Sequence, residues 1–145
     1  MIIKMIIQGI SAFFATAGFA VLFHLPRKYM IQAGLTGSIG WFIYLLMMNL
    51  CKDGALANFT ATIIVALTSH ILARVLKTPV TMFLIPGIIP MVPGAGMYQI
   101  VQNVLNNTLG QAAYYFVETM KMAGAIALGI FIVDTLFRIQ QKPKC

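Results

Sequence analysis

Long apolar runs, separated by short polar or charged turns, dominate the chain. Charged residues and turn formers divide it into five apolar segments, at residues 3–24, 30–51, 55–76, 80–101 and 112–137. Each holds about 20 residues or more, which is enough to cross a hydrocarbon core of roughly 30 Å as an α-helix. The pattern predicts five transmembrane helices in a single transmembrane domain, residues 1–145.

The composition supports the same class. Of the 145 residues, 60% are hydrophobic and only 9% are charged, whereas soluble domains average about 25% charged residues. A soluble chain this short could not bury so much apolar surface, so we expect an all-α integral membrane protein in contact with the lipid bilayer. The net charge of +7 does not indicate a nucleic-acid partner, because the basic residues are scattered singly or in pairs between apolar runs.

The placement of lysine and arginine predicts the orientation. If the N-terminus faces outside, two basic residues, Lys4 and Lys52, lie on the outer side. The cytoplasmic side then carries seven, namely Arg27, Lys28, Arg74, Lys77, Arg138, Lys142 and Lys144. Cytoplasmic loops of membrane proteins carry the excess of positive charge. We therefore expect the N-terminus outside and the C-terminus inside, in the plasma (inner) membrane.

The fourth apolar segment contains residues that disfavour helices. It reads FLIPGIIPMVPGAGMYQIV over residues 83–101, with three prolines and three glycines between positions 86 and 96. Proline removes a backbone donor and clashes with the preceding turn, and one proline alone would give an ordinary kink. Three prolines with three glycines predict a break around residues 86–96 and a second helix starting near Gly96 or Met97.

Such a break is typical of substrate sites in transporters. Broken helices place helix ends and unwound backbone near the bilayer middle, and free N–H groups at a helix start suit a carboxylate. We predict that the substrate is bound by Pro86, Gly87, Pro90, Pro93, Gly94, Gly96, Tyr98 and Gln99. The alternative is a re-entrant loop that is packed for structure alone.

Three ionisable residues inside the apolar segments are candidates for proton coupling. His70 could relay protons, because an unperturbed histidine titrates near pH 6.5, or it could simply hydrogen-bond a neighbouring helix. Glu118 and Lys121 are three residues apart and can meet on one helix face. They form either an ion pair lining an aqueous entrance or an interfacial pair that snorkels. Asp134, one turn before Arg138, predicts an ion pair at a helix end.

Other polar and aromatic residues have simpler interpretations. Asn58 flanks an outer loop and is expected to be structural. Trp41 and Tyr44 fall in mid-span and fit core packing better than a pathway lining. Tyr114 and Tyr115 fit an interfacial aromatic belt.

The sequence offers no chemistry for an enzyme. Only three acidic residues are present, and none pairs with another at a catalytic spacing. Cys51 and Cys145 are far apart and lie on opposite sides in the expected topology, so neither a disulfide nor a metal site is expected. We predict no cofactor and no bound metal.

The stretch FLIPGIIPMVPGAGMYQ, residues 83–99, resembles the threonine/serine exporter family through its P-G-x-x-P-x-V-P-G-x-x-x-Y pattern. Length, five apolar segments and a basic C-terminus resemble the small membrane subunit of the split form, which is similar to the C-terminal half of the fused exporters. The later stretch KMAGAIALGIFI, residues 121–132, supports the resemblance weakly.

The resemblance implies half of an inverted-repeat transporter. The other half would come from a larger partner subunit with a cytoplasmic domain and about five spans. The implied activity is secondary export of small carboxylate metabolites, either threonine and serine or succinate-like dicarboxylates, coupled to the proton gradient. Two alternatives stay open: a homo-oligomeric channel with residues 86–96 as its filter loop, and an assembly subunit without a site of its own.

Overall fold

The computed structural model describes residues 2–140, which form six α-helices and two short 3-10 turns. The helices are α1 (Ile2–Leu22), α2 (Met30–Cys51), α3 (Gly54–Leu76), α4 (Thr81–Ile88), α5 (Gly94–Leu105) and α6 (Leu109–Gln140), and the turns are η1 (Arg27–Tyr29) and η2 (Ile89–Met91). Four helices, α1, α2, α3 and α6, are long and apolar enough to cross a membrane. A fifth span exists if the bent pair of Thr81–Met91 and Gly94–Leu105 is counted as one. The predicted all-helical membrane class is confirmed.

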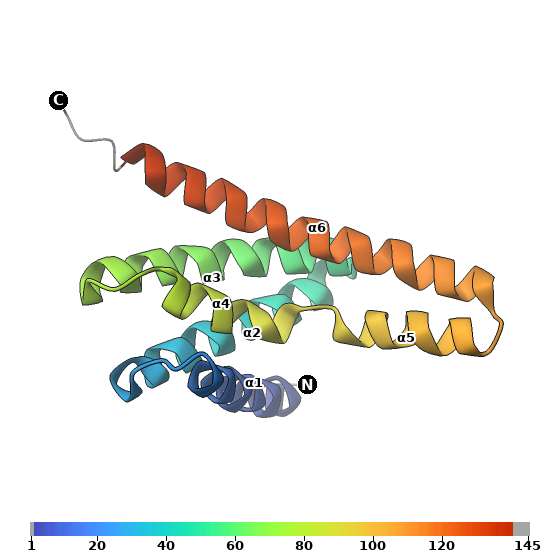
Figure 1. The fold of residues 1–145 in the computed structure, drawn as a ribbon, viewed down its shortest axis with the longest axis horizontal. Coiled ribbons are helices and arrows are strands. Elements are labelled where there is room, and N and C mark those ends of the chain that lie inside the picture. The colour runs from blue at the N-terminus through green and yellow to red at the C-terminus, as the bar shows by residue number, and fades with distance from the viewer. Residues whose placement is uncertain (1, 141–145) are drawn as a thin grey trace.

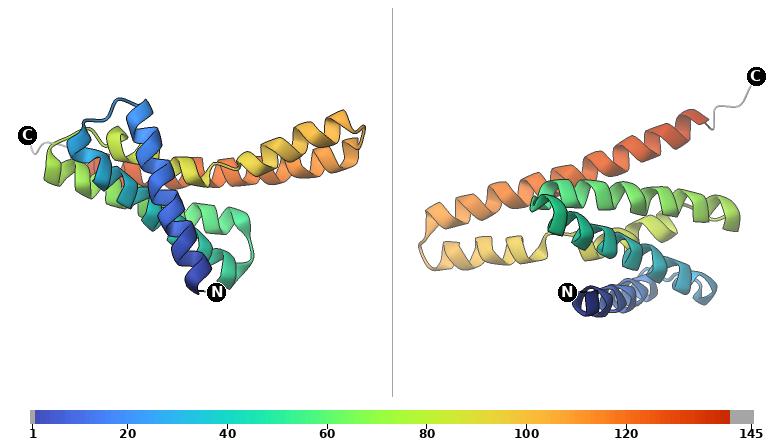
Figure 2. Two further views of the ribbon diagram at one scale, coloured as in Figure 1. Left: turned by 90° about the horizontal axis from the view of Figure 1, so that it is seen from below. Right: turned by 180° about the vertical axis from the view of Figure 1, so that it is seen from behind.

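The helices form a bundle around α2 and α3 (Figures 1 and 2). The long helices pack in the order α1, α2, α3 and α6, and α4 lies against both α2 and α3. The buried core is made of small residues with a few larger side chains, in two clusters: Ala20, Ala33, Ala73 and Phe83, and Ala61, Val65, Met91 and Ile126. Small residues suit a membrane bundle because helix association in lipid depends on close backbone approach.

Two glycines of α2 show how close this approach is. A Cβ at Gly37 would overlap the buried Thr16 of α1, and a Cβ at Gly40 would overlap Val65 of α3 and Met91 of η2. Helix α2 therefore contacts both neighbours through positions that carry no side chain. This packing also holds η2, and hence the break after it, against the bundle.

The interruption of the fourth segment is shorter than the sequence predicts. Pro86 and Gly87 lie inside α4, the chain tightens into η2, and α5 begins at Gly94. The expected break at 86–96 is therefore too wide, and the expected second helix starts too late. One proline late in a short helix is tolerated as a local distortion, whereas Pro90 and Pro93 follow each other too closely for the helix to continue. The two parts of the segment are bent by 47°.

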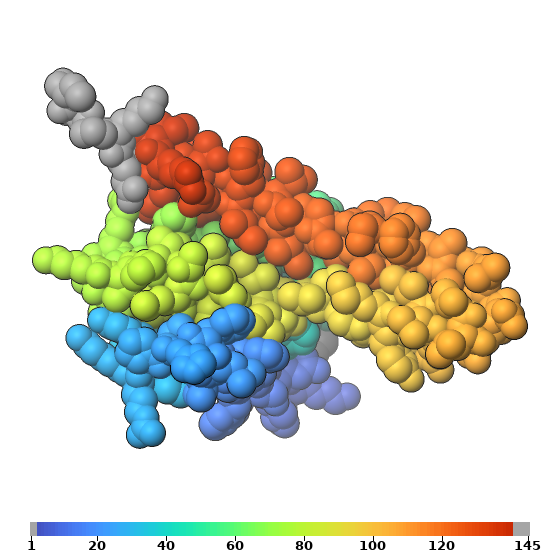
Figure 3. All heavy atoms as spheres, in the orientation of Figure 1, coloured from blue at the N-terminus to red at the C-terminus, as the bar shows by residue number. Residues whose placement is uncertain are grey.

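The polar stretch at residues 102–111 connects the last two helices. It holds the end of α5, a tight turn and the start of α6. The turn is closed by Thr108, whose hydroxyl donates to Asn103 Oδ1 at 2.8 Å, and by Asn107 with a φ of 57°. Helices α5 and α6 thus form a hairpin arm that extends beyond the rest of the bundle (Figure 3). Helix α6, with 32 residues, is about 48 Å long.

Basic residues gather at one end of the bundle. The loop after α1, the C-terminus of α3 and the C-terminus of α6 lie at the same end (Figures 1 and 2). These segments carry Arg27, Lys28, Arg74, Lys77 and Arg138, while Lys142 and Lys144 lie outside the described residues. The grouping agrees with the charge pattern used above, and the orientation itself, N-terminus out and C-terminus in, stays a prediction.

Candidate functional site

A pocket of about 420 Å³ lies at the broken helix. Residues 90–96 line it, together with Gln99 of α5. Helix α3 contributes Asn58, and α2 contributes Trp41 and Tyr44. Helix α6 contributes Tyr114, Tyr115, Glu118, Thr119 and Met122. This volume falls in the range of small-molecule sites, about 300–1,000 Å³.

The pocket collects five of the eight predicted substrate-binding residues, which are Pro90, Pro93, Gly94, Gly96 and Gln99. The other three lie elsewhere. Pro86 and Gly87 are buried inside α4, where Gly87 faces Val65 and Thr36. Tyr98 is 65% exposed and does not line the pocket.

The start of α5, which lines the pocket, has backbone N–H groups without partners inside the helix. Its N-cap residue, Pro93, offers no side-chain cap, and the first turn holds no acidic residue. The N–H of Gly94 donates to Val92 O at 2.7 Å, whereas the N–H groups of Ala95 and Gly96 belong to the first turn and have no carbonyl one turn back inside the helix. Such N–H groups carry a partial positive charge that suits an anion.

Two buried polar side chains at the pocket lack partners. Asn58 is 1% exposed and Thr119 is 2% exposed, and neither Asn58 Oδ1 nor Thr119 Oγ1 has a hydrogen-bond partner among the described residues. Unsatisfied buried polar atoms are rare and costly. Both side chains line the pocket. The sequence interpretation of Asn58 as a structural residue does not place it at the pocket, because its position near a helix start looks like an ordinary loop flank.

Aromatic rings form part of the wall. Trp41 and Tyr44 lie with ring centroids 5.1 Å apart, and Tyr114 and Tyr115 pair edge to face at 5.6 Å. All four line the pocket. From the sequence, the first pair is assigned to core packing and the second pair to an interfacial belt. Nothing in the local pattern indicates that residues of α2 and α6 line one pocket at the break.

Glu118 and Lys121 form the expected pair on α6. Lys121 Nζ donates to Glu118 Oε1 at 2.7 Å, and both side chains are partly exposed. Glu118 lines the pocket but Lys121 does not. Among residues 2–140, the pocket lining therefore contains one acidic side chain and no basic one. The role of this pair in proton coupling stays a prediction.

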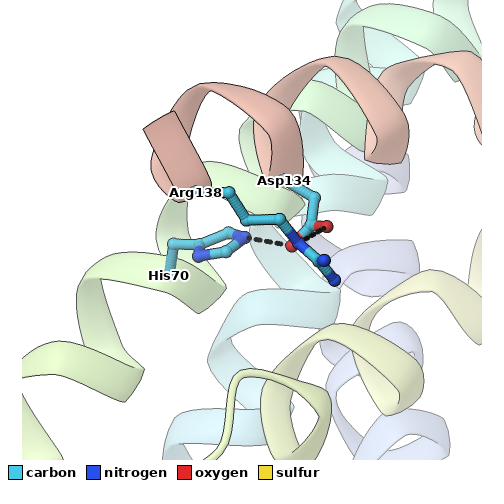
Figure 4. Close-up of polar contacts among 3 residues, drawn as sticks. All are labelled: His70, Asp134 and Arg138. Carbon is cyan, nitrogen blue, oxygen red and sulfur yellow. Dashed lines mark hydrogen bonds and ion pairs between the residues drawn. The ribbon is translucent and has the colours of Figure 1, made fainter. Parts of the chain in front are cut away.

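His70 lies away from the pocket, at the α3–α6 interface near the basic end of the bundle. Its Nε2 faces Asp134 Oδ1 at 3.7 Å, and Arg138 Nε donates to Asp134 Oδ2 at 2.8 Å (Figure 4). The predicted ion pair of Asp134 and Arg138 is present. The structure thus separates the three proton-coupling candidates into two places.

Among residues 2–140, no three His, Cys, Asp or Glu side chains lie close enough together to hold a metal ion. Cys51 is an exposed free thiol, and Cys145 lies outside the described residues.

The fold and the pocket together define a class of protein. Several helices are long and apolar enough to span a membrane, and a further apolar segment is interrupted beside a pocket with unpaired polar groups. That combination is typical of secondary transporters, which bind substrates at discontinuous helices.

Comparison with known proteins identifies the family. Residues 8–136 match the family described as "Threonine/Serine exporter, ThrE", so the chain belongs to the threonine/serine exporter family, a family of transporters rather than enzymes. Membership and the apolar helices make it a multi-pass protein of the plasma membrane, as predicted.

Two relatives illustrate the similarity. An uncharacterised protein of Haemophilus influenzae is 26% identical over 97% of this chain and 50% of its own length. A protein of Corynebacterium glutamicum named threonine/serine exporter is 28% identical over 97% of this chain and 28% of its own length. The chain thus spans half of the first relative and less than a third of the second. No solved structure matches the chain.

The contact between α5 and α6 beside the pocket gives a testable prediction. A Cβ at Gly96 would overlap the Thr119 hydroxyl, so Gly96→Ala should lower stability by about 1–3 kcal/mol, as overpacking does. Removing the hydroxyl with Thr119→Ala should restore most of the loss. Thermal unfolding in detergent measures both variants. The matched control is Gly124→Ala on α6, where a Cβ meets nothing within 4 Å. Equal melting temperatures for Gly96→Ala and Gly124→Ala would contradict the described contact.

Proposed function

We propose that this chain is the membrane subunit of a secondary exporter, and that the pocket at the broken helix binds the exported molecule. The observation that carries the proposal is that two kinds of unsatisfied polar group occur at the same pocket. They are the free backbone N–H groups at the start of α5 and the buried, unpartnered side chains of Asn58 and Thr119. These groups belong to different helices that line one pocket. A small molecule with a carboxylate and a second polar group would satisfy both.

The lining favours an amino acid over a dicarboxylate. The carboxylate would lie at the first turn of α5, where N–H groups point toward an anion. A substrate ammonium or hydroxyl would donate to Asn58 Oδ1, with the Glu118 carboxylate nearby. The second carboxylate of a succinate-like molecule would meet this same acidic side chain, and no basic side chain from residues 2–140 lines the pocket. Threonine and serine therefore fit better, in line with the name of the Corynebacterium glutamicum relative.

We further propose that a larger partner subunit completes the transporter. Helix α5 packs mainly against α6, which leaves Met97, Val101 and Leu105 exposed on the arm. The relatives are two to more than three times longer than the part that this chain matches. Two halves of inverted topology around one site are common in secondary transporters, and this chain would supply one of them.

The role of Asn58 can be separated from its effect on stability. Replacing a buried unsatisfied amide by an apolar group of similar shape is near neutral or stabilising, so Asn58→Leu should keep or raise the melting temperature. Export should nevertheless fall at least about tenfold. The substrate would lose a hydrogen bond of about 1.4 kcal/mol or more, and each 1.4 kcal/mol corresponds to a tenfold change in affinity. Efflux of labelled threonine from preloaded cells measures export.

The matched control is Asn49→Leu, because Asn49 is exposed and its side chain bonds only its own helix, at Leu45 O. This variant should export normally. Normal export by Asn58→Leu would remove the main support for the pocket as the substrate site.

The partner and the substrate are tested together. Cells lacking their own exporters would express this chain alone, or with a candidate larger subunit of the same family, and would be preloaded with labelled threonine or succinate. We expect efflux only when both subunits are present, and faster efflux of threonine than of succinate. Efflux from this chain alone would contradict the two-subunit proposal and favour a homo-oligomeric channel, and faster succinate efflux would contradict the amino-acid assignment.

A further inference from the structure

The far end of the α3–α6 interface carries a buried histidine that the substrate pocket does not use. His70 is 6% exposed. On one side, its ring stacks on Phe137 of α6, with centroids 4.3 Å apart and planes 11° apart. At its edge, Nε2 faces Asp134 Oδ1 at 3.7 Å. The histidine is thus held by α6 on both its face and its edge, and Figure 4 shows the edge contact with Asp134.

We propose that His70 and Asp134 form one proton-binding site that ties α3 to α6 at this end of the bundle. The proton is taken up from water at His70 Nε2 and released from the same atom. With neutral histidine, the 3.7 Å separation is too long for a good hydrogen bond. With protonated histidine, the two side chains attract as opposite charges, and partial burial keeps that attraction from being fully screened.

The charged neighbours of His70 are few. From α6 it faces Asp134, with Arg138 on the other carboxylate oxygen. Its own helix contributes Arg74, whose guanidinium lies 4.7 Å from the Phe137 ring centroid. The other helices packed against α3, namely α2 and α4, contain no charged residue. Asp134 is therefore the one carboxylate facing His70 among the described residues, and at 38% exposure these residues do not enclose it.

The same two helices connect this site to the pocket. On α3, His70 lies twelve residues after Asn58, and on α6, Asp134 lies fifteen residues after Thr119, which is about 18–22 Å along each helix. Between them, Gly129 packs closely on α3, where its Cβ would approach Thr62 and the Phe59 carbonyl at 3.2–3.3 Å. A close contact at a glycine can act as a pivot, so closing the helices at His70 would change their separation at the pocket. This link to export rests on the proposed function, whereas the proton-binding site does not.

The site is tested by a distance measurement that needs no transport. Spin labels are placed at Val75 and Ile139, which are 72% and 62% exposed near the ends of α3 and α6, in a chain whose Cys51 and Cys145 are replaced by serine. The full chain is reconstituted in lipid nanodiscs and measured by pulsed electron resonance. Lowering the pH from about 8.5 to about 4.5, which extends below the ordinary histidine range, should shorten the distance by roughly 1–2 Å, as for packed helix shifts.

Three variants identify the groups responsible. His70→Gln and Asp134→Asn should each abolish the change with pH, and the second keeps the buried ring in place if the first disturbs folding. Arg138→Gln is the matched control, because it removes the exposed partner of Asp134 and leaves His70 untouched, so the change should persist. A native distance that does not respond to pH, or a response that survives in both His70→Gln and Asp134→Asn, would overturn the proposal. Normal export by Asn58→Leu, with an intact pH response of the distance in the native chain, would instead contradict the proposed function alone.

Discussion

The need to satisfy backbone hydrogen bonds inside a membrane governs this structure. Lipid offers no partners for free N–H and C=O groups, so unwound backbone persists there only when protein covers it or water reaches it. The chain places its break, between η2 and α5, against α2, α3 and α6. The glycines of α2 make this possible, because Gly40 lets Met91 and Val65 approach the α2 backbone. The close packing at Gly40 and the uncapped start of α5 therefore depend on each other.

The break also determines what the pocket can bind. The polar groups of the pocket include hydrogen-bond donors and acceptors. The donors are the N–H groups at the start of α5, and the acceptors are oxygen atoms of Asn58, Thr119 and Glu118. A molecule that carries both an anionic and a donor group matches this division, and amino acids have that character. The second polar cluster, at His70, lies toward the other end of the same helix pair, so the proposed proton site and the proposed substrate site occupy different parts of the molecule.

Much of the fold follows from the sequence because lipid imposes a simple rule on segment length. The second segment, predicted at 30–51, coincides with α2, and the third differs from α3 by one residue. The break was harder to place, because Pro86 looks the same in sequence as Pro90 and Pro93, and only tertiary packing decides that α4 continues past it. Pocket residues on other helices, such as Asn58 and Thr119, could not be recognised, since no local pattern records which helices meet.

The most direct test of the central claim asks whether substrate reaches the break. A single cysteine replaces Ala95, which lines the pocket at the first turn of α5, in a chain with Cys51 and Cys145 changed to serine. Its reaction with a water-soluble maleimide is followed in membranes that contain the assembled transporter. We predict that the thiol reacts, and that threonine slows the reaction in a concentration-dependent manner while an equal concentration of glycerol does not. An unreactive thiol, or a reaction rate that neither threonine, serine nor succinate changes, would contradict the assignment of the broken helix as the substrate site.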